Sequence, residues 1–182
     1  MLLSNKNEVL KKILKSYEGY FDIEECSESD IPLVAKCQFH VHNKKYVLVK
    51  KATLWESDAN EYVYIFKVDN LTKEIFNKCK NYAYDYGMKL INPKPGHMYS
   101  YITTIFICDS CEKEAEKLLT KCNLYKSFKF SFYGWMDFHT VCIDVNNDKI
   151  FGNKSGKNTT KFFKDLLIKK ANILHKRNKE YC

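Results

Sequence analysis

Apolar residues repeat along the chain with two periods, and each period predicts a different kind of element. Spacings of three and four predict a helix over residues 5–17 and a second helix over 71–88. A short third helix is expected after Cys108, because Asp109 and Glu112 resemble a capping box. The last helix is expected to bury one apolar side, which holds Phe162, Phe163, Leu166, Leu167 and Leu174.

Alternation with a period of two predicts the strands. After a short extended piece at 21–26, three strands are expected over residues 33–41, 45–55 and 61–68. Polar residues at 43–45 and 57–60 predict the turns between them, so an antiparallel meander is expected here. Residues 99–108 are apolar at both parities, which predicts a central strand covered on both faces.

The aromatic stretch after the third helix also alternates. Phe128, Phe130 and Phe132 share one parity, which predicts a strand with three rings in the core and then a turn over 134–137. A partner strand is expected over 141–145, and a turn over 146–148 leads to a short strand at KIF.

The resulting element order is α-β-β-β-α-β-α-β-β-β-α. This order predicts the α+β class, with a mixed, mostly antiparallel sheet covered by helices. At 182 residues the chain is long enough to bury one large core, so we expect a single domain over residues 1–182, with a basic C-terminal segment from residue 149.

Composition narrows the class of protein. A hydrophobic content of 45% is too high for a disordered chain, and no apolar run approaches the roughly 18 residues of a membrane span. Charged residues from Lys6 to Lys12 favour an amphipathic helix over a signal peptide at the N-terminus. We therefore expect a cytoplasmic protein without transmembrane insertion, whose eight cysteines are reduced.

The net charge of +8 is concentrated at one end of the chain. Residues 149–182 hold ten basic side chains and two acidic ones, so the preceding part is neutral. A basic segment on a neutral body attracts polyanions such as nucleic acid. The candidate polyanion-binding residues are Lys154, Lys157, Lys161 and Lys164. Because Arg177 is the single arginine of the chain, base-specific readout is not expected.

Aromatic residues offer a second candidate contact with nucleic acid. Single-strand binders stack bases on exposed rings beside lysines, and Lys126 and Lys129 lie within the aromatic stretch. With the three phenylalanines assigned to the core, Tyr133 and Trp135 are the possible stacking pair.

Two cysteines form a CxxC motif, Cys108 and Cys111, where the central strand is expected to meet a helix. The positive end of a helix dipole lowers a thiol pKa, so this pair is a possible redox site. Thioredoxin-like proteins also place a cis-proline against their CxxC, and this chain has no proline after Pro95. The alternative is one buried and one incidental cysteine.

Metal sites and cofactors find little support in the sequence. A zinc site would need to join the CxxC to Cys122, His97 or His139, but no second CxxC and no HxxxH occurs. His40 and His42 share a strand face with Lys36 and Gln38, which solvent exposure explains. We expect no metal and no cofactor.

Nucleotide and nuclease motifs are incomplete. GNKSGKNTT is similar to a phosphate loop but has three residues between its glycines instead of four, so a polar loop with Asn158 or Thr159 as helix N-cap is expected. The element order resembles the restriction-endonuclease-like fold, yet Glu-x-Lys is absent, and Asp30, Glu61 and Lys67 are wrongly spaced for one metal.

Several phrases of the chain carry a resemblance: FDIEE, KKATLWESDANEYVYIFK, HMYSYITT, KSFKFSFYGWMD and NKSGK. They are similar to an uncharacterised family of prokaryotic proteins, known as conserved hypothetical sequences without an assigned activity. The likeness covers about residues 17–164, and it implies a domain but no chemistry.

The sequence therefore favours a non-catalytic binding or interaction module of unknown ligand, with sequence-nonspecific polyanion binding as its expected activity. The alternative is an enzyme, either a divergent metal nuclease or a dithiol protein using Cys108 and Cys111. A weaker alternative is a membrane-surface protein, because the last helix combines apolar residues with lysines. The sequence leaves a protein partner unknown.

Overall fold

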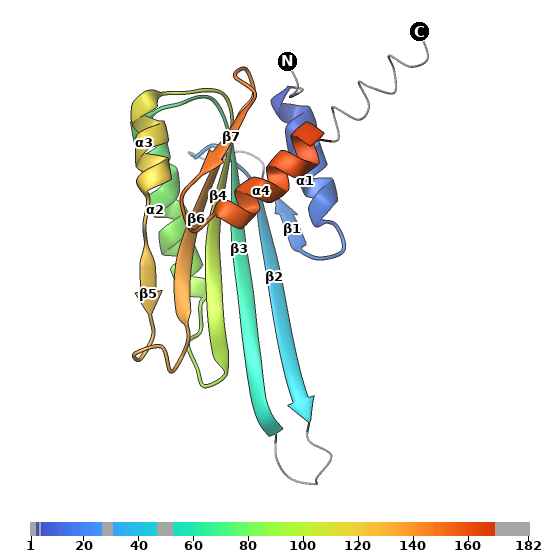
Figure 1. Cartoon of the computed structure of the whole chain (residues 1–182), viewed down its shortest axis with the longest axis vertical. Helices are drawn as coiled ribbons and strands as arrows, with labels where there is room; N and C mark the ends of the chain where they lie inside the picture. Colours follow the sequence, from blue (N-terminus) through green and yellow to red (C-terminus); the bar gives the residue numbers. More distant parts are fainter. Residues whose placement is uncertain (1–2, 4, 27–30, 47–52, 170–182) are drawn as a thin grey trace.

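The computed structural model describes residues 3, 5–26, 31–46 and 53–169 (Figure 1). Its elements are α1 (Lys6–Tyr17), β1 (Asp22–Glu25), β2 (Leu33–Tyr46), β3 (Thr53–Leu71), α2 (Lys73–Leu90), β4 (His97–Cys111), α3 (Lys113–Lys121), β5 (Tyr125–Ser127), β6 (Trp135–Asp144), β7 (Lys149–Gly152) and α4 (Lys157–Lys164), followed by a π-helical turn, η1 (Asp165–Lys169). The α+β class and the predicted order of helix and strand types are confirmed. The strands before α2 differ from the prediction, because the short extended piece forms β1, and the described residues of the expected middle strand, 45–46 and 53–55, belong to β2 and β3.

The seven strands of the described residues form one mixed sheet with the order β1-β2-β3-β4-β6-β5. Strand β7 also pairs with β6, at residues 141–144, whereas β5 pairs with residues 135–137 of β6. The pairs β3–β4 and β4–β6 are parallel, and the other four pairs are antiparallel. Parallel neighbours need a crossover, which α2 supplies between β3 and β4 and α3 supplies between β4 and β6.

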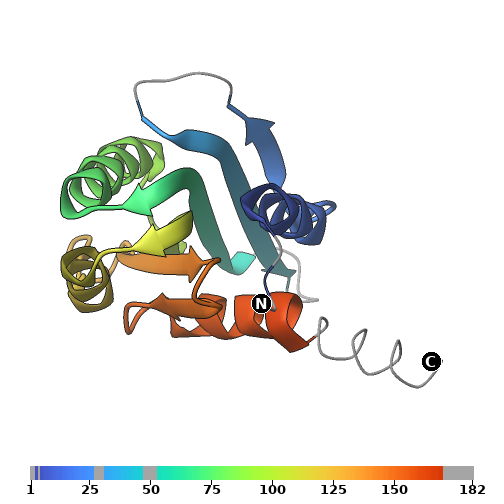
Figure 2. The ribbon, with the colours of Figure 1, turned by 90° about the horizontal axis from the view of Figure 1, so that it is seen from above.

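Helices cover both faces of the sheet, so the core has two halves (Figure 2). One half lies under α2 and α3 and contains Phe66, Phe76 and Phe106. The other half lies under α1 and α4 and contains Ile13, Ile105 and Phe163. Strand β4 contributes alternate residues to both halves, which confirms the prediction that it is central and covered on both faces. Among the described helices, none is long and apolar enough to cross a bilayer.

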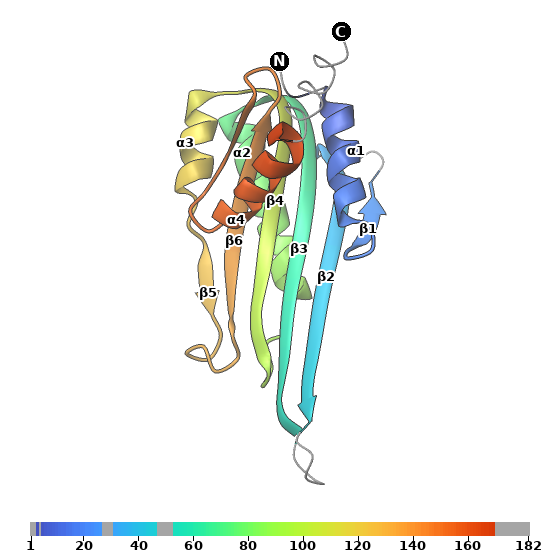
Figure 3. The ribbon, with the colours of Figure 1, turned by 45° about the vertical axis from the view of Figure 1, so that its right-hand side comes forward.

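The two turns predicted in the meander are wrong. Residues 43–45 continue β2, and residues 57–60 continue β3, so the two strands pair as one long antiparallel ribbon (Figure 3). Polar residues persist in β3 because it is paired on both sides there: Asp58 lies opposite His42 on β2 and His97 on β4. The connection between β2 and β3, at 47–52, lies outside the described residues.

The strand predicted over the aromatic stretch is also wrong. Strand β5 ends at Ser127, and Phe130 and Phe132 are 96% and 82% exposed instead of buried. Of the predicted turn at 134–137, Gly134 ends the loop, and residues 135–137 begin β6. A loop with positive φ angles separates the two strands, so the alternation of phenylalanines does not reflect a sheet.

The predicted capping box before α3 does not form. Strand β4 continues to Cys111, and Glu112 takes the N-cap position, but its side chain does not cap the helix. Asp109 instead accepts a 2.6 Å hydrogen bond from Lys6 of α1, which also pairs with Asp69. Burial opposes the charge on Lys6, but these two carboxylates outweigh it and raise the Lys6 pKa.

Candidate functional site

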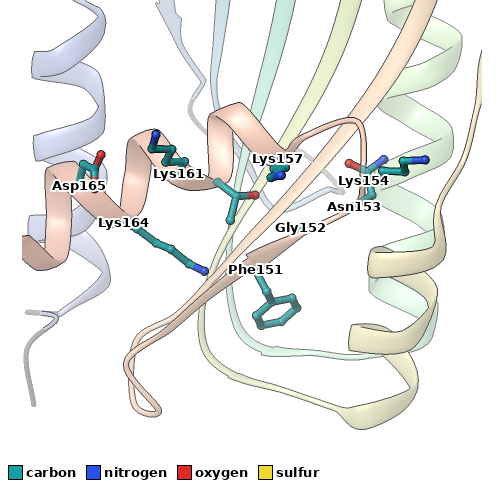
Figure 4. A pocket seen from close by; sticks show the side chains of 9 residues that line it. Phe151, Gly152, Asn153, Lys154, Lys157, Lys161, Lys164 and Asp165 are labelled. Atoms are coloured by element: carbon teal, nitrogen blue, oxygen red, sulfur yellow. The ribbon is translucent and has the colours of Figure 1, made fainter.

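The four candidate lysines lie around one hollow. It measures about 650 Å³, opens to the surface between the end of β7 and α4, and is called the lysine hollow below. Its lining residues are Phe151, Gly152, Asn153, Lys154, Lys157, Thr160, Lys161, Lys164 and Asp165. Figure 4 shows Lys164 extending from α4 toward Phe151, whereas Lys154 and Lys161 point away from that ring. All four lysines are exposed.

A buried asparagine fixes the floor of the lysine hollow. Asn153 is 2% exposed, and its side-chain oxygen accepts hydrogen bonds from the backbone N–H groups of Thr140 and Gly156 at 3.0 and 2.8 Å. Its amide nitrogen donates to the carbonyls of Cys122 and Phe138 at 2.9 and 2.8 Å. One side chain therefore ties the loop before α4 to β6 and to the end of α3.

Close backbone packing explains the glycines of GNKSGKNTT. A Cβ atom at Gly152 would lie 2.4 Å from the Thr140 carbonyl oxygen, and one at Gly156 would lie 2.9 Å from the Asn153 side-chain oxygen. These glycines let β7 and the start of α4 press against β6. The N-cap of α4 is Gly156 and not Asn158 or Thr159, so that prediction is wrong.

Electrostatics at the start of α4 favours an anion. The first turn contains Lys157 and no acidic residue, and no side chain caps its free N–H groups. A lysine at the positive end of a helix dipole is unfavourable, and a bound anion would offset both charges. Asp165 contributes one carboxylate at the opposite end of the hollow. The remaining basic residues of the C-terminal segment, from Lys170 onward, lie outside the described residues.

Tyr133 and Trp135 do not line the lysine hollow. Tyr133 precedes β6, and the Lys129 ammonium lies 4.7 Å from its ring centroid. Trp135 begins β6 and stacks obliquely on Tyr99, with ring centroids 6.0 Å apart. Both side chains are half-buried, so the structure does not join the predicted stacking pair to the predicted lysines.

The CxxC motif lies within a strand and not at a strand–helix junction. Cys108 and Cys111 both belong to β4, and three residues of extended chain span about 10 Å, whereas a disulfide needs Cα atoms within about 7 Å. The neighbour of Cys108 is Cys142 on β6, with the two sulfur atoms 3.5 Å apart. The geometry therefore does not fit a disulfide between Cys108 and Cys111.

The thiols of this cluster nevertheless differ in acidity. A hydrogen bond from Cys142 lowers the pKa of the half-buried Cys111 thiol, although burial and nearby carboxylates oppose the shift. Burial raises the pKa of the Cys142 thiol, and it also raises the pKa values of Cys26 and Cys122. Cys111 is thus the thiol of this group that forms a thiolate most readily.

We expect Cys111 to react with iodoacetamide at neutral pH several-fold faster than Cys26 and Cys122, because alkylation requires the thiolate. Peptide mapping by mass spectrometry would measure the rates. Cys142→Ala should slow the alkylation of Cys111, because it removes the hydrogen-bond donor. Cys142→Ser keeps a donor and should preserve the alkylation rate of Cys111. Equal rates in both variants would contradict this assignment.

A buried histidine, which the sequence suggested only as a possible zinc ligand, lies on β6. His139 on β6 is 7% exposed, and its Nδ1 atom has no hydrogen-bond partner among the described residues. Its Nε2 atom lies 4.0 Å from the Asp137 carboxylate, and the Tyr101 ring packs on it at 4.4 Å. Burial lowers the His139 pKa, and Asp137 only partly opposes this shift, so the imidazole is neutral at pH 7.

Glu61 lies on the same face of the sheet, two strands away. Burial raises its pKa, and a 2.7 Å hydrogen bond from the Thr103 hydroxyl partly opposes the shift. Same-face parity along β3 and β6 is the sequence signal for this pair. However, the part of the chain that the structure describes contains no group of three His, Cys, Asp or Glu residues able to hold a metal.

The enzyme alternatives gain no support from the placement of their residues. Glu61 and Lys67 are six residues apart on β3, about 20 Å along the strand, and Lys67 donates to Asn7. Asp30 and the His42 side chain lie outside the described residues, and His40 bonds with Asn60. Both ring nitrogens of His97 are engaged, by Ser100 and by the Tyr133 carbonyl.

Comparisons with known proteins agree with the resemblance in one respect, a family without an assigned activity. The chain is 25% identical to a MATH and LRR domain-containing protein of Plasmodium falciparum over 198 residues, which cover 98% of this chain but only 2% of that protein. No solved structure matches the chain. A family model matches residues 5–165, from the start of α1 to the end of α4. The chain therefore belongs to the family described as a domain of unknown function, DUF8052.

Proposed function

We propose that this protein is a non-catalytic binding module that holds a polyanion, with nucleic acid as the expected ligand, at the lysine hollow. The observation that carries the proposal is the position of four exposed lysines around a single open hollow. Lys157, Lys161 and Lys164 lie three or four residues apart along α4, and Lys154 lies in the loop before this helix.

The chemistry of the hollow fits phosphate groups on a flexible chain. Four ammonium groups with one carboxylate among them repel one another, and a polyanion would relieve this repulsion while releasing its own counterions. Lysine contacts phosphate as a point charge and does not read base edges in a fixed geometry. Binding without base specificity follows. A cytoplasmic location in a prokaryotic cell, which the sequence predicts, would give access to such a ligand.

Binding should fall steeply with salt. If each lysine neutralises about one phosphate, affinity for a fluorescein-labelled oligonucleotide should drop about a hundredfold between 50 and 200 mM salt. Fluorescence anisotropy measures this slope. Replacing Lys154, Lys157, Lys161 and Lys164 with Gln should remove most of the binding and flatten the salt dependence, with the fold preserved because all four side chains are exposed.

A charge-matched variant distinguishes the effect of the lysine hollow on affinity from the effect of the net charge. Lys89, Lys113, Lys117 and Lys121 lie on α2 and α3, which cover the other face of the sheet, and all four are exposed. Replacing these four with Gln changes the net charge equally and should leave affinity within about threefold of the unmodified protein. Equal losses in the two quadruple variants, or salt-independent binding, would contradict the proposal.

A further inference from the structure

The loop between β5 and β6 presents two phenylalanines to solvent. Residues 128–134, called the aromatic loop below, expose 96% of Phe130 and 82% of Phe132. These side chains have no polar atom, and exposed apolar groups that lie close together mark interaction sites more often than isolated ones do. The loop connects β5 and β6 at the lower ends of these two strands in Figures 1 and 3, above the lower tips of β2 and β3.

Backbone hydrogen bonds hold the aromatic loop in a defined shape. Phe128 donates to the Gly134 carbonyl at 3.0 Å, and Tyr133 donates back to Phe128 at 3.1 Å. At the tip, Lys129, Phe130 and Ser131 have φ angles of 45°, 54° and 69°. Three consecutive non-glycine residues in the left-handed region are costly, and such strain collects at functional sites.

The base of the aromatic loop is anchored to β4. The Phe128 ring packs against His97 with centroids 5.9 Å apart, and the His97 Nδ1 atom lies 2.7 Å from the Tyr133 carbonyl oxygen. Phe128 is also packed against the core under α2 and α3. The rings at the tip therefore project from a rigid support and do not result from a frayed chain end.

Positive charge flanks the exposed rings. Residues 125–134 include Lys126 and Lys129 and no acidic residue. Both ammonium groups lie over rings of the loop base: Lys126 is 5.9 Å from Phe128, and Lys129 is 4.7 Å from Tyr133. Tyr125, at the start of β5, is 57% exposed. Apolar rings at a tip with lysines and tyrosines behind them are typical of segments that enter the interface of an anionic membrane.

We propose that the aromatic loop inserts Phe130 and Phe132 into the headgroup and acyl boundary of an anionic lipid bilayer, with Lys126 and Lys129 against the lipid headgroups. A bilayer accepts both projecting rings at once and needs no complementary pocket. Base stacking would instead require a basic groove beside the rings, and no residue of the aromatic loop lines the lysine hollow. This interaction is separate from the proposed polyanion binding.

Flotation of the full chain with vesicles tests the proposal. The protein should float with phosphatidylcholine vesicles that contain phosphatidylserine and bind pure phosphatidylcholine vesicles much more weakly. The double variant F130S/F132S should lose at least about tenfold in affinity through the missing apolar contact. K126Q and K129Q should each lose about fivefold. Since these side chains are exposed, the unfolding temperature should not fall.

Matched variants and a depth probe complete the test. Y20S/L118S removes two exposed apolar side chains elsewhere and should bind vesicles normally. Tryptophan at position 130, in F130W, should show a blue-shifted emission with vesicles and quenching by brominated lipids. Binding to oligonucleotides should be unchanged in F130S/F132S, which keeps this result independent of the polyanion proposal.

Three outcomes would overturn the membrane assignment. They are absence of flotation with phosphatidylserine, equal flotation of F130S/F132S and the unmodified chain, and an unshifted F130W emission. Loss of oligonucleotide binding by F130S/F132S without loss of vesicle binding would assign the aromatic loop to base stacking instead.

Discussion

Replacing Asn153 with alanine is expected to lower the free energy of unfolding by about 3–5 kcal/mol. The side chain satisfies two backbone N–H groups and two carbonyls, all with distances between 2.8 and 3.0 Å. Alanine would leave these groups unpaired in a nearly dry site, because Asn153 is 2% exposed. Urea denaturation followed by circular dichroism measures the change.

Asn153→Asp should lower the stability of the protein for a different physical reason. The carboxylate can still accept from Thr140 and Gly156, but it places negative charge against the Cys122 and Phe138 carbonyls, so it should also destabilise the protein. Asn158→Ala, at an exposed position of α4, is the control and should change stability by less than about 0.5 kcal/mol. Equal stability of Asn153→Ala and Asn158→Ala would contradict the role given to Asn153.

The second large effect is expected at Gly134, where alanine should cost about 2–4 kcal/mol. Its φ angle is +72°, and an added Cβ would lie 2.3 Å from the Met98 carbonyl oxygen and 2.6 Å from that of His97. Backbone atoms cannot move aside as a flexible side chain can. The substitution should therefore separate the aromatic loop from β4, and thermal unfolding would report the loss.

Gly19→Ala is the matched control for this substitution. Gly19 has a φ angle of +82°, but an added Cβ there would have no neighbouring atom within 4 Å, so only the conformational cost of about 1 kcal/mol applies. The difference between the two variants isolates the close approach of Gly134 to β4. If Gly134→Ala were no more destabilising than Gly19→Ala, the close contact would not contribute to stability.

A helix or strand was predictable from the sequence where the spacing of its apolar residues is the spacing that its kind of element requires. The helical spacing over 71–88 corresponds to α2, where Phe76, Cys79 and Ala83 are buried against the sheet. The doubly apolar run at 99–108 corresponds to β4, because both faces of that strand are covered by helices. In these cases the local pattern and the tertiary packing agree on the kind of element.

Prediction failed where local pattern and tertiary contacts conflict. Ser57 to Asn60 has the composition of a turn, but pairing on both sides keeps these residues in β3. Phe130 and Phe132 alternate as in a strand, but the positive φ angles at 129–131 turn the chain before a second strand can form. Neither the pairing partners nor these dihedral angles can be read from single-residue preferences.

In the candidate site, too, some features were predictable from the sequence and others were not. The concentration of positive charge after residue 149 pointed to Lys154, Lys157, Lys161 and Lys164, and the structure shows that these four side chains border one hollow. The role of Asn153 was not predictable, because its partners lie 13 to 31 residues earlier in the sequence for Thr140, Phe138 and Cys122. The unpaired Nδ1 of His139 likewise depends on packing around β6.

Mapping the contact surface by nuclear magnetic resonance tests the central claim most directly. A 15N-labelled sample of the full chain would be titrated with a short single-stranded oligonucleotide at low salt. We expect the largest amide shifts at 152–164, around the lysine hollow, and their disappearance when salt is raised. Shifts confined to α2 and α3, or no shifts at low salt, would contradict binding at the lysine hollow.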